Sequence, residues 1–261
     1  MSYGSIEFNS IKIIKNTKFS KIRCFLEDME VNLEETLFLY YENYAYEILD
    51  AVYDFFNGTQ LDFNHMSLTK INIGEQFNFI PVRAFYGCDS LKEVSMENIK
   101  EINEFAFFDC ENLENIKFSN NLNIIKDYAF SNCKSINKIK FNEELRIIGE
   151  SVFENCIKLQ EINLTPHIGT IGDYTFNNCI SLKNINFNKK IAIINEFTFS
   201  GCENLENIII PKNIKLIRNF AFENCKNLKL ICCENKNIDI ETYSFDNKTG
   251  YMPIIKLIER I

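Results

Sequence analysis

Apolar and polar residues alternate in short segments that recur along most of the chain every 22 or 23 residues. The segment Leu113–Phe118, with the sequence LENIKF, is representative: its first, fourth and sixth residues are apolar and its fifth is polar. This alternation is typical of a β-strand with one buried face. Equivalent segments begin at residues 68, 91, 113, 136, 159, 182, 205 and 228, so the pattern predicts eight strands.

Two further registers of the repeat are apolar and lie before each strand segment. A phenylalanine register comprises Phe85, Phe107, Phe130, Phe153, Phe176, Phe199 and Phe222, and a cysteine register three residues later comprises Cys88, Cys110, Cys133, Cys156, Cys179, Cys202 and Cys225. Disulfide scaffolds and zinc sites use close pairs such as C-x-x-C, which this chain lacks. Because free cysteine behaves as a small buried apolar residue, we expect both registers to form ladders in a continuous core.

The length of the repeat decides the predicted fold. A unit of about 23 residues is too short for two helices and fits one strand with a return path of turns or short helical pieces. No single unit could bury its own apolar side chains, whereas stacked units share one core. The sequence therefore predicts a leucine-rich-repeat solenoid of about eight repeats over residues 61–248.

The pattern I-x-x-x-A-F-x-x-C-x-x-L-x-x-I-x-F resembles the BspA-like class of leucine-rich repeats over roughly residues 61–248. The resemblance implies an α/β solenoid, curved and right-handed, with a parallel β-sheet on its concave face. It also implies a surface that binds proteins and no shared catalytic residues. Some BspA-like proteins act at cell surfaces, so the resemblance leaves cell-surface adhesion open as an alternative function.

The first sixty residues do not follow the repeat and predict a small α+β unit of order β-β-α-β-α. Residues 19–23 and 46–56 resemble the start of the BTB/POZ and elongin C fold, which implies an adaptor or substrate receptor for a ubiquitin ligase. The sequence favours a simpler interpretation, in which residues 1–60 cap the apolar edge of the first repeat. The apolar residues 249–261 are expected to cap the last repeat.

Charge and hydropathy narrow the class of partner. The formal net charge is −8, and an acidic chain repels phosphates, so we expect no nucleic-acid partner. No apolar run approaches the roughly 20 residues of a membrane-spanning helix, and the segment MSYGSIEFNS does not resemble a secretory signal. We therefore expect a cytoplasmic protein without membrane insertion, with non-classical export to the cell surface as the alternative.

The sequence lacks the motifs of common catalytic and nucleotide-binding sites. H-E-x-x-H, G-x-S-x-G, Walker and G-x-G-x-x-G patterns are missing, and His65 and His167 are several repeats apart. The repeat cysteines occupy core positions, where a thiolate is disfavoured. We expect a non-enzymatic protein with neither a cofactor nor a metal, which binds a protein partner of unknown identity through the solenoid surface.

Strand residues between the core positions are expected to line the concave face and to contact the partner. The first group is a small basic patch, followed by an acidic residue, a neutral hydrogen-bonding stretch and an apolar end. In that order the groups are Lys117, Lys138 and Lys140; Glu161; Asn163, Asn184, Asn186 and Asn207; and Ile209 and Leu230. The plainer alternative is an ordinary solvated sheet, since aromatic hot-spot residues are missing from this face.

A second stripe of residues lies two positions before the phenylalanine register. It contains Phe105, Tyr128, Tyr174, Phe197, Phe220 and Tyr243. We expect these rings to pack the return turns on the convex side. Partial exposure would be the reason to regard them as a binding surface.

Overall fold

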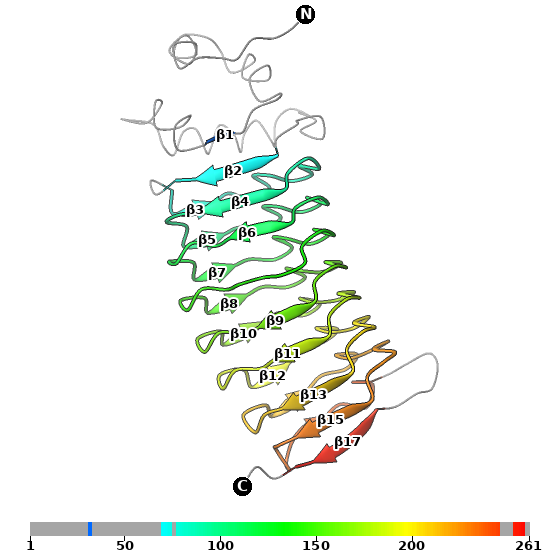
Figure 1. Ribbon diagram of the computed structural model, residues 1–261. Coiled ribbons are helices and arrows are strands. Elements are labelled where there is room, and N and C mark those ends of the chain that lie inside the picture. The colour runs from blue at the N-terminus through cyan, green and yellow to red at the C-terminus, as the bar shows by residue number, and fades with distance from the viewer. Residues whose placement is uncertain (1–30, 33–68, 75–76, 246–252, 259–261) are drawn as a thin grey trace, which may run out of the picture.

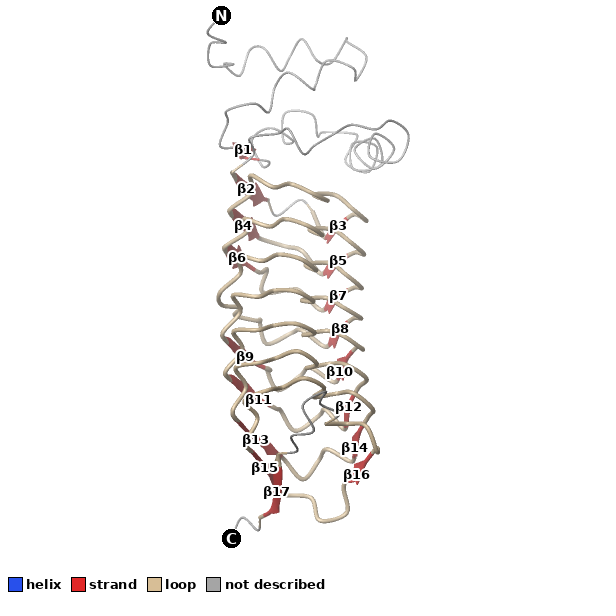
Figure 2. Ribbon diagram, turned by 90° about the vertical axis from the view of Figure 1, so that its right-hand side faces the viewer, coloured by secondary structure: helices blue, strands red, loops and turns tan. Residues whose placement is uncertain are grey.

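The computed structural model describes residues 31–32, 69–74, 77–245 and 253–258. In this part of the chain, two rows of strands run along a solenoid and face each other across its core (Figure 1; Figure 2). The row of longer strands contains β2 (Lys70–Ile73), β4 (Glu93–Met96), β6 (Asn115–Lys117), β9 (Glu161–Asn163), β11 (Asn184–Asn186), β13 (Asn207–Ile210), β15 (Leu230–Cys233) and β17 (Ile254–Leu257). The row of two-residue strands contains β3 (Phe79–Ile80), β5 (Glu101–Ile102), β7 (Ile124–Ile125), β8 (Ile147–Ile148), β10 (Thr170–Ile171), β12 (Ile193–Ile194), β14 (Leu216–Ile217) and β16 (Asp239–Ile240). We call their outer surfaces the long-strand face and the short-strand face.

The strand pairs are parallel and keep a constant register. Lys70 lies opposite Glu93, and Glu161 lies opposite Asn184, so each residue pairs with its equivalent one repeat further along. The long-strand row is divided into three hydrogen-bonded sheets, of order β1-β2-β4-β6, β11-β9 and β13-β15-β17, where β1 is Val31–Asn32. The row is therefore interrupted twice, between β6 and β9 and between β11 and β13.

Seven of the eight strands predicted from the sequence are present. The segment that begins at residue 136 forms only an isolated parallel bridge between Lys138 and Glu161, so the prediction of a strand there was wrong. The short-strand row was not predicted. Within the described ranges the return paths consist of turns and these short strands, without the short helical pieces that the length of the repeat also allowed.

The core lies between the two rows of strands. In it, equivalent side chains of successive repeats stack on one another. Ring centroids are 5.0 Å apart for Phe107 and Phe130, and 5.7 Å apart for Phe153 and Phe176, with interplanar angles of 5° in both pairs. Within the phenylalanine register, the residues from Phe107 to Phe222 are at most 2% exposed, whereas Phe85 at the N-terminal end is half-buried. A parallel, offset ring geometry is a favourable one, so the stacked rings tie each repeat to the next.

The core cysteines use their thiols as hydrogen-bond donors. Sγ of Cys133 donates to the carbonyl oxygen of Phe107 at 3.1 Å, and Sγ of Cys225 donates to that of Phe199 at 3.1 Å. Equivalent bonds are made by Cys110, Cys156, Cys179 and Cys202. Burial raises the pKa of these thiols well above the ordinary value, because a buried thiolate would lose its hydration. The thiols therefore remain protonated and able to donate.

Two kinds of backbone hydrogen bond alternate along each return turn. The N–H of Tyr128 donates to the carbonyl oxygen of Glu150 in the next repeat at 2.9 Å, while the N–H of Ala129 donates back to Lys126 in its own turn at 3.3 Å. Tyr128 has a left-handed backbone, with φ of 58°, and a non-glycine residue incurs roughly 1–2 kcal/mol in that region. The hydrogen bonds between repeats and the packing of the rings offset this cost.

The residues before the core cysteines share the left-handed backbone and form a ladder of side chains. Nδ2 of Asn178 donates to Oδ1 of Asn155 at 3.1 Å, Nδ2 of Asn155 donates to Oδ1 of Asn132 at 2.7 Å, and Nδ2 of Asn132 donates to Oδ1 of Asp109 at 2.7 Å. Gly201, with φ of 72°, occupies the next register, where a Cβ would lie 2.2 Å from Oδ1 of Asn178. The ladder therefore ends at Gly201.

Both ends of the long-strand row gain a strand outside the eight predicted ones. β1 pairs in parallel with β2, with Val31 opposite Ile71. The strands and helices predicted for residues 1–60 fall outside the described residues, and β1 was not among them. At the other end β17, within the segment 249–261, pairs in parallel with β15.

Replacing a stacked core ring should be far more costly than replacing an exposed one. We expect Phe153→Ala to lower the free energy of unfolding by about 3–5 kcal/mol, because a fully buried ring leaves a cavity. Tyr243→Ala is the control, since Tyr243 is 54% exposed, and should lower it by less than about 1 kcal/mol. Urea unfolding followed by circular dichroism measures both, and equal losses would contradict the stacked-core description.

The core thiols should be unreactive in the folded protein. Alkylation requires the thiolate, and a raised pKa lowers the thiolate fraction at mildly alkaline pH, so we expect iodoacetamide to leave Cys133, Cys156 and Cys179 unmodified until the protein is unfolded in guanidinium. Cys232, which is partly exposed on β15, should be modified in the folded protein. Peptide mass spectrometry gives the extent of modification, and rapid native labelling of the ladder would refute its burial.

Candidate functional site

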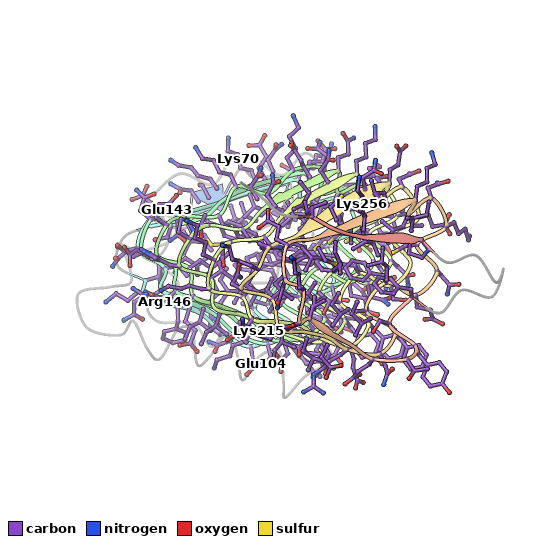
Figure 3. The ribbon with its side chains drawn as sticks, turned by 90° about the horizontal axis from the view of Figure 1, so that it is seen from below. Lys70, Glu104, Glu143, Arg146, Lys215 and Lys256 are labelled. Atoms are coloured by element: carbon purple, nitrogen blue, oxygen red, sulfur yellow. The ribbon has the colours of Figure 1, made fainter. Side chains whose placement is uncertain are left out.

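The long-strand face presents two rows of outward side chains, because alternate residues of a strand point to the same side. One row passes through Lys70, Glu93 and Asn115, and the other through Asn72, Ser95 and Lys117. Seen along the solenoid axis, Lys70 and Lys256 lie on this side of the molecule, and Glu104 and Lys215 lie on the opposite side (Figure 3).

A hollow of about 880 Å³ opens on the long-strand face where the row of strands is interrupted. It spans five consecutive repeats, from β2 to β9. Its lining comprises Lys70, Ile71, Glu93, Val94, Ser95, Glu114, Asn115, Ile116, Lys117, Asn137, Lys138, Ile139, Lys140, Phe141, Glu143, Glu161, Asn163 and Thr165. A hollow of this size accommodates several side chains of a partner.

Residues 138–140 do not pair with β6, and like charges disfavour that pairing. In the register of the other strands, Lys138 would lie opposite Asn115 and Lys140 opposite Lys117. Two lysines directly opposite each other on one face repel and destabilise strand pairing. The basic patch predicted from the sequence therefore lies at one of the two places where the row of strands is interrupted.

The hollow contains unpaired charges of both signs. Lys70 and Glu93 form a salt bridge of 3.1 Å at one end of it. In the part of the chain that the structure describes, by contrast, no ion pair is formed by Lys117, Lys138 and Lys140, nor by Glu114, Glu143 and Glu161. These groups are solvated in the free protein and available to charges on a partner.

Apolar residues form the floor of the hollow. Ile139 is 7% exposed and Phe141 is 5% exposed, while Ile116 on β6 is half-buried. The hollow thus combines a mostly buried apolar floor, on which Ile116 is the more accessible side chain, with a charged rim. This is the general anatomy of a protein-binding site, in which an apolar centre is surrounded by polar groups.

Five of the ten surface residues predicted from the sequence line the hollow. They are Lys117, Lys138, Lys140, Glu161 and Asn163. The other five lie on the same face beyond the hollow, on β11, β13 and β15: Asn184, Asn186, Asn207, Ile209 and Leu230. The structure therefore brings the basic patch together with the start of the asparagine stretch and leaves the apolar end separate.

Part of the asparagine stretch uses its amides within the sheet. Nδ2 of Asn186 donates to Oδ1 of Asn163 at 2.9 Å. At the apolar end, Ile209 is 47% exposed and Leu230 lies opposite Ile254 of β17. These side chains extend the long-strand face along the solenoid beyond the hollow.

Sequence reasoning missed several residues of the hollow. Glu114, Glu143 and Thr165 lie before or after the outward strand positions, so the alternation of the strands gave no reason to select them. The segment 136–141 has the same alternation as its neighbours. The interruption could have been anticipated from the two lysines one repeat apart, Lys117 and Lys140.

The described residues offer no arrangement for a metal or a membrane span. Within these ranges, histidine, cysteine and acidic side chains form no group of three or more that could hold a metal ion. No helix in the same ranges is long and apolar enough to cross a bilayer. Nδ1 of His167 lies 2.8 Å from the carbonyl oxygen of Glu143, which fixes this imidazole near the rim of the hollow.

The repeat has a counterpart among known protein families. The family model of the BspA type leucine rich repeat region matches residues 60–179 and 146–257, in six copies. The chain belongs to this family. The match spans the described solenoid, and it confirms the family resemblance seen in the sequence. Among curated proteins, none matches this BspA-type chain.

One solved structure of a leucine-rich repeat protein shares the fold, and two others are similar to this chain at lower TM-scores. A leucine-rich repeat protein of T. pallidum is 26% identical, with a TM-score of 0.56 over 62% of this chain and 78% of the other. A leucine-rich repeat protein from Bacteroides ovatus is 23% identical, with a TM-score of 0.42 over 70% of this chain and 61% of the other. A leucine rich cell surface protein from Faecalibacterium prausnitzii is 19% identical, with a TM-score of 0.36 over 73% and 79%.

The lysines of the hollow should contribute little to the stability of the BspA-type solenoid. Because Lys117, Lys138 and Lys140 form no ion pair with any described residue, we expect their joint replacement by alanine to change the free energy of unfolding by less than about 1 kcal/mol. Ile139→Ala, in the same segment, should lower it by about 2–4 kcal/mol, since Ile139 is buried. Urea unfolding separates the two cases, and a large loss in the lysine variant would show that these side chains hold the fold together.

Proposed function

We propose that this BspA-type protein is a non-enzymatic protein-interaction module that binds a segment of its partner in the hollow of the long-strand face. The observation that carries the proposal is the set of solvated charges around an apolar floor, at the interruption of the sheet. Membership of a family of leucine-rich repeats, which typically serve as protein-interaction modules, supports it.

The charges of the hollow define the partner segment. Lys117, Lys138 and Lys140 require acidic groups opposite them, and Glu143 and Glu161 require basic groups. A uniformly negative polymer such as nucleic acid would meet the glutamates of the hollow and the net charge of −8. A protein segment of mixed charge with a central apolar side chain fits both the rim and the floor.

The alternative functions depend on other parts of the protein. Docking to a ubiquitin ligase concerns residues 1–60, of which only Val31 and Asn32 are described. Cell-surface adhesion and cytoplasmic location concern where the protein resides, which surface labelling of intact cells would measure. Both stay predictions, and the proposal for the hollow depends on neither.

Site-specific photocrosslinking tests the proposal. Benzoylphenylalanine is introduced at Lys117 or Lys140 in the full chain, and the same photoreactive residue is placed at Lys215, on the opposite side of the molecule (Figure 3), as the control. We expect a protein adduct in native lysate from the two hollow positions and none from the control. Mass spectrometry of the adduct identifies the partner and the crosslinked segment.

Charge reversal makes the test specific. Lys138→Glu should reduce the adduct yield about tenfold, because it replaces an attraction at the rim by a repulsion of similar size, each worth up to about 1 kcal/mol. Lys215→Glu, which makes the same change in net charge, should leave the yield unchanged. Equal adduct yields at Lys117 and Lys215, or no adduct from the hollow, would contradict this function.

A further inference from the structure

The short-strand face carries an apolar stripe across five consecutive repeats. The first residue of each short strand points outward and the second points into the core, so that Ile147 is 41% exposed whereas Ile148 is fully buried. Ile193 is 38% exposed and lies opposite Leu216 of the next repeat. The stripe consists of Ile124, Ile147, Ile193 and Leu216, with Thr170 in the middle. Single exposed apolar residues are ordinary on a protein surface, but an aligned row of them is a candidate interface.

Cations follow one edge of the stripe. The residue before each short strand is uncharged except in three repeats, where it is Lys100, Arg146 or Lys215, and all three are exposed. Within the described ranges, Lys100 and Lys215 form no salt bridge. Arg146 pairs with Glu144 at 3.2 Å, and about half of each side chain is exposed. An exposed pair of this kind is weak, so a partner can replace it.

Carboxylates follow the other edge of the stripe. The third residue after the outward position is acidic in five consecutive repeats, at Glu104, Asp127, Glu150, Asp173 and Glu196. Lys126 lies 3.7 Å from Glu104, whereas the other four form no salt bridge with a lysine or arginine that the structure describes. Seen along the solenoid axis, Glu104 and Lys215 lie on the side opposite Lys70, and Arg146 lies nearer the left edge (Figure 3). The short-strand face is thus apolar in the middle, positive along one edge and negative along the other.

This pattern of charge is complementary to itself in one orientation. A two-fold axis parallel to the solenoid axis exchanges the two edges of the face, so the cations of one copy lie opposite the carboxylates of the other. The two apolar stripes then meet in the middle, each repeat against the same repeat of the other copy. In the antiparallel orientation, cations would meet cations and carboxylates would meet carboxylates. Charge complementarity therefore favours a second copy of this chain in the parallel orientation.

We propose that the short-strand face pairs two copies of this protein side by side and in parallel. The outward side chains of the two stripes interdigitate, as in the aligned packing of two sheets, and Arg146 of one copy meets Glu150 of the other. The hydroxyl of Tyr128 donates to Oε1 of Glu150 at 3.1 Å and holds this carboxylate in place. At the N-terminal end of the stripe, Glu101 does not oppose the pairing, because Lys126 balances its charge at 2.6 Å.

The pairing leaves the hollow of each copy open. The hollow lies on the long-strand face, across the core from the short strands (Figure 2), so the two hollows of a dimer face outward in opposite directions. Two partner segments are then held by one particle, which raises the avidity for a multivalent partner. Small interfaces are weak, and we expect a dissociation constant on the order of 100 µM. At the much lower concentration of crosslinking in a lysate the copies stay apart, so Lys215 serves there as a control for the hollow.

Sedimentation equilibrium of the full chain, at concentrations on either side of that value, tests the pairing. We expect a reversible equilibrium of monomer and dimer. Ile147→Asp with Ile193→Asp places like charges in the middle of the interface and should weaken association at least about tenfold. Ile209→Asp is the matched control, since Ile209 is 47% exposed on β13 of the long-strand face, and should leave association unchanged. Circular dichroism verifies that each variant is folded.

Exchange of two charges tests the orientation. Arg146→Glu alone and Glu150→Arg alone should each weaken association about tenfold, because the contact occurs twice in a symmetric dimer. The chain that carries both substitutions again presents opposite charges and should associate like the unmodified protein. In an antiparallel dimer, by contrast, Arg146→Glu alone would strengthen association. A monomer at every concentration, a dimer that the two aspartates leave intact, or a double exchange that stays as weak as the single ones would overturn the proposal.

Discussion

The arrangement of this solenoid depends on a constant register between successive turns, held by backbone hydrogen bonds that run from one repeat to the next. In each return turn, alternate N–H groups donate along the solenoid axis, as Tyr128 does to Glu150. Because that register is constant, rings stack on rings and thiols meet the same carbonyl in each repeat. A slip of one residue would turn every side chain of a strand to the other face.

Much of the fold could be predicted from the sequence, because the core residues recur with a constant period. The spacing of residues such as Phe130 and Cys133 identified the repeat, and strand alternation located seven long strands. The short strands could not be found in this way. A pair such as Ile147 and Ile148 has no alternation to detect, and it is extended only because the neighbouring repeat bonds to it. The helices expected before residue 60 lie outside the described residues.

The candidate site contains features that the repeat pattern does not predict. Lys117 and Lys140 lie on one face, as the strand alternation predicts, but the interruption of the sheet between them concerns how two repeats pair, which the pattern of a single repeat does not show. In a repeat protein, the repeat pattern explains the fold. Departures from that pattern distinguish the surface of one such protein from that of another.

The amide ladder from Asn178 to Asp109 has a direction. Every amide donates toward the preceding repeat, and the last acceptor is the carboxylate of Asp109, which cannot donate. This carboxylate fixes the orientation of Asn132, and each amide then fixes the next. Duplication of a whole repeat between Asn132 and Asn155 would add one amide with the same orientation and leave both ends unchanged. The ladder thus allows a gene to gain or lose internal units without any new chemistry at the turns.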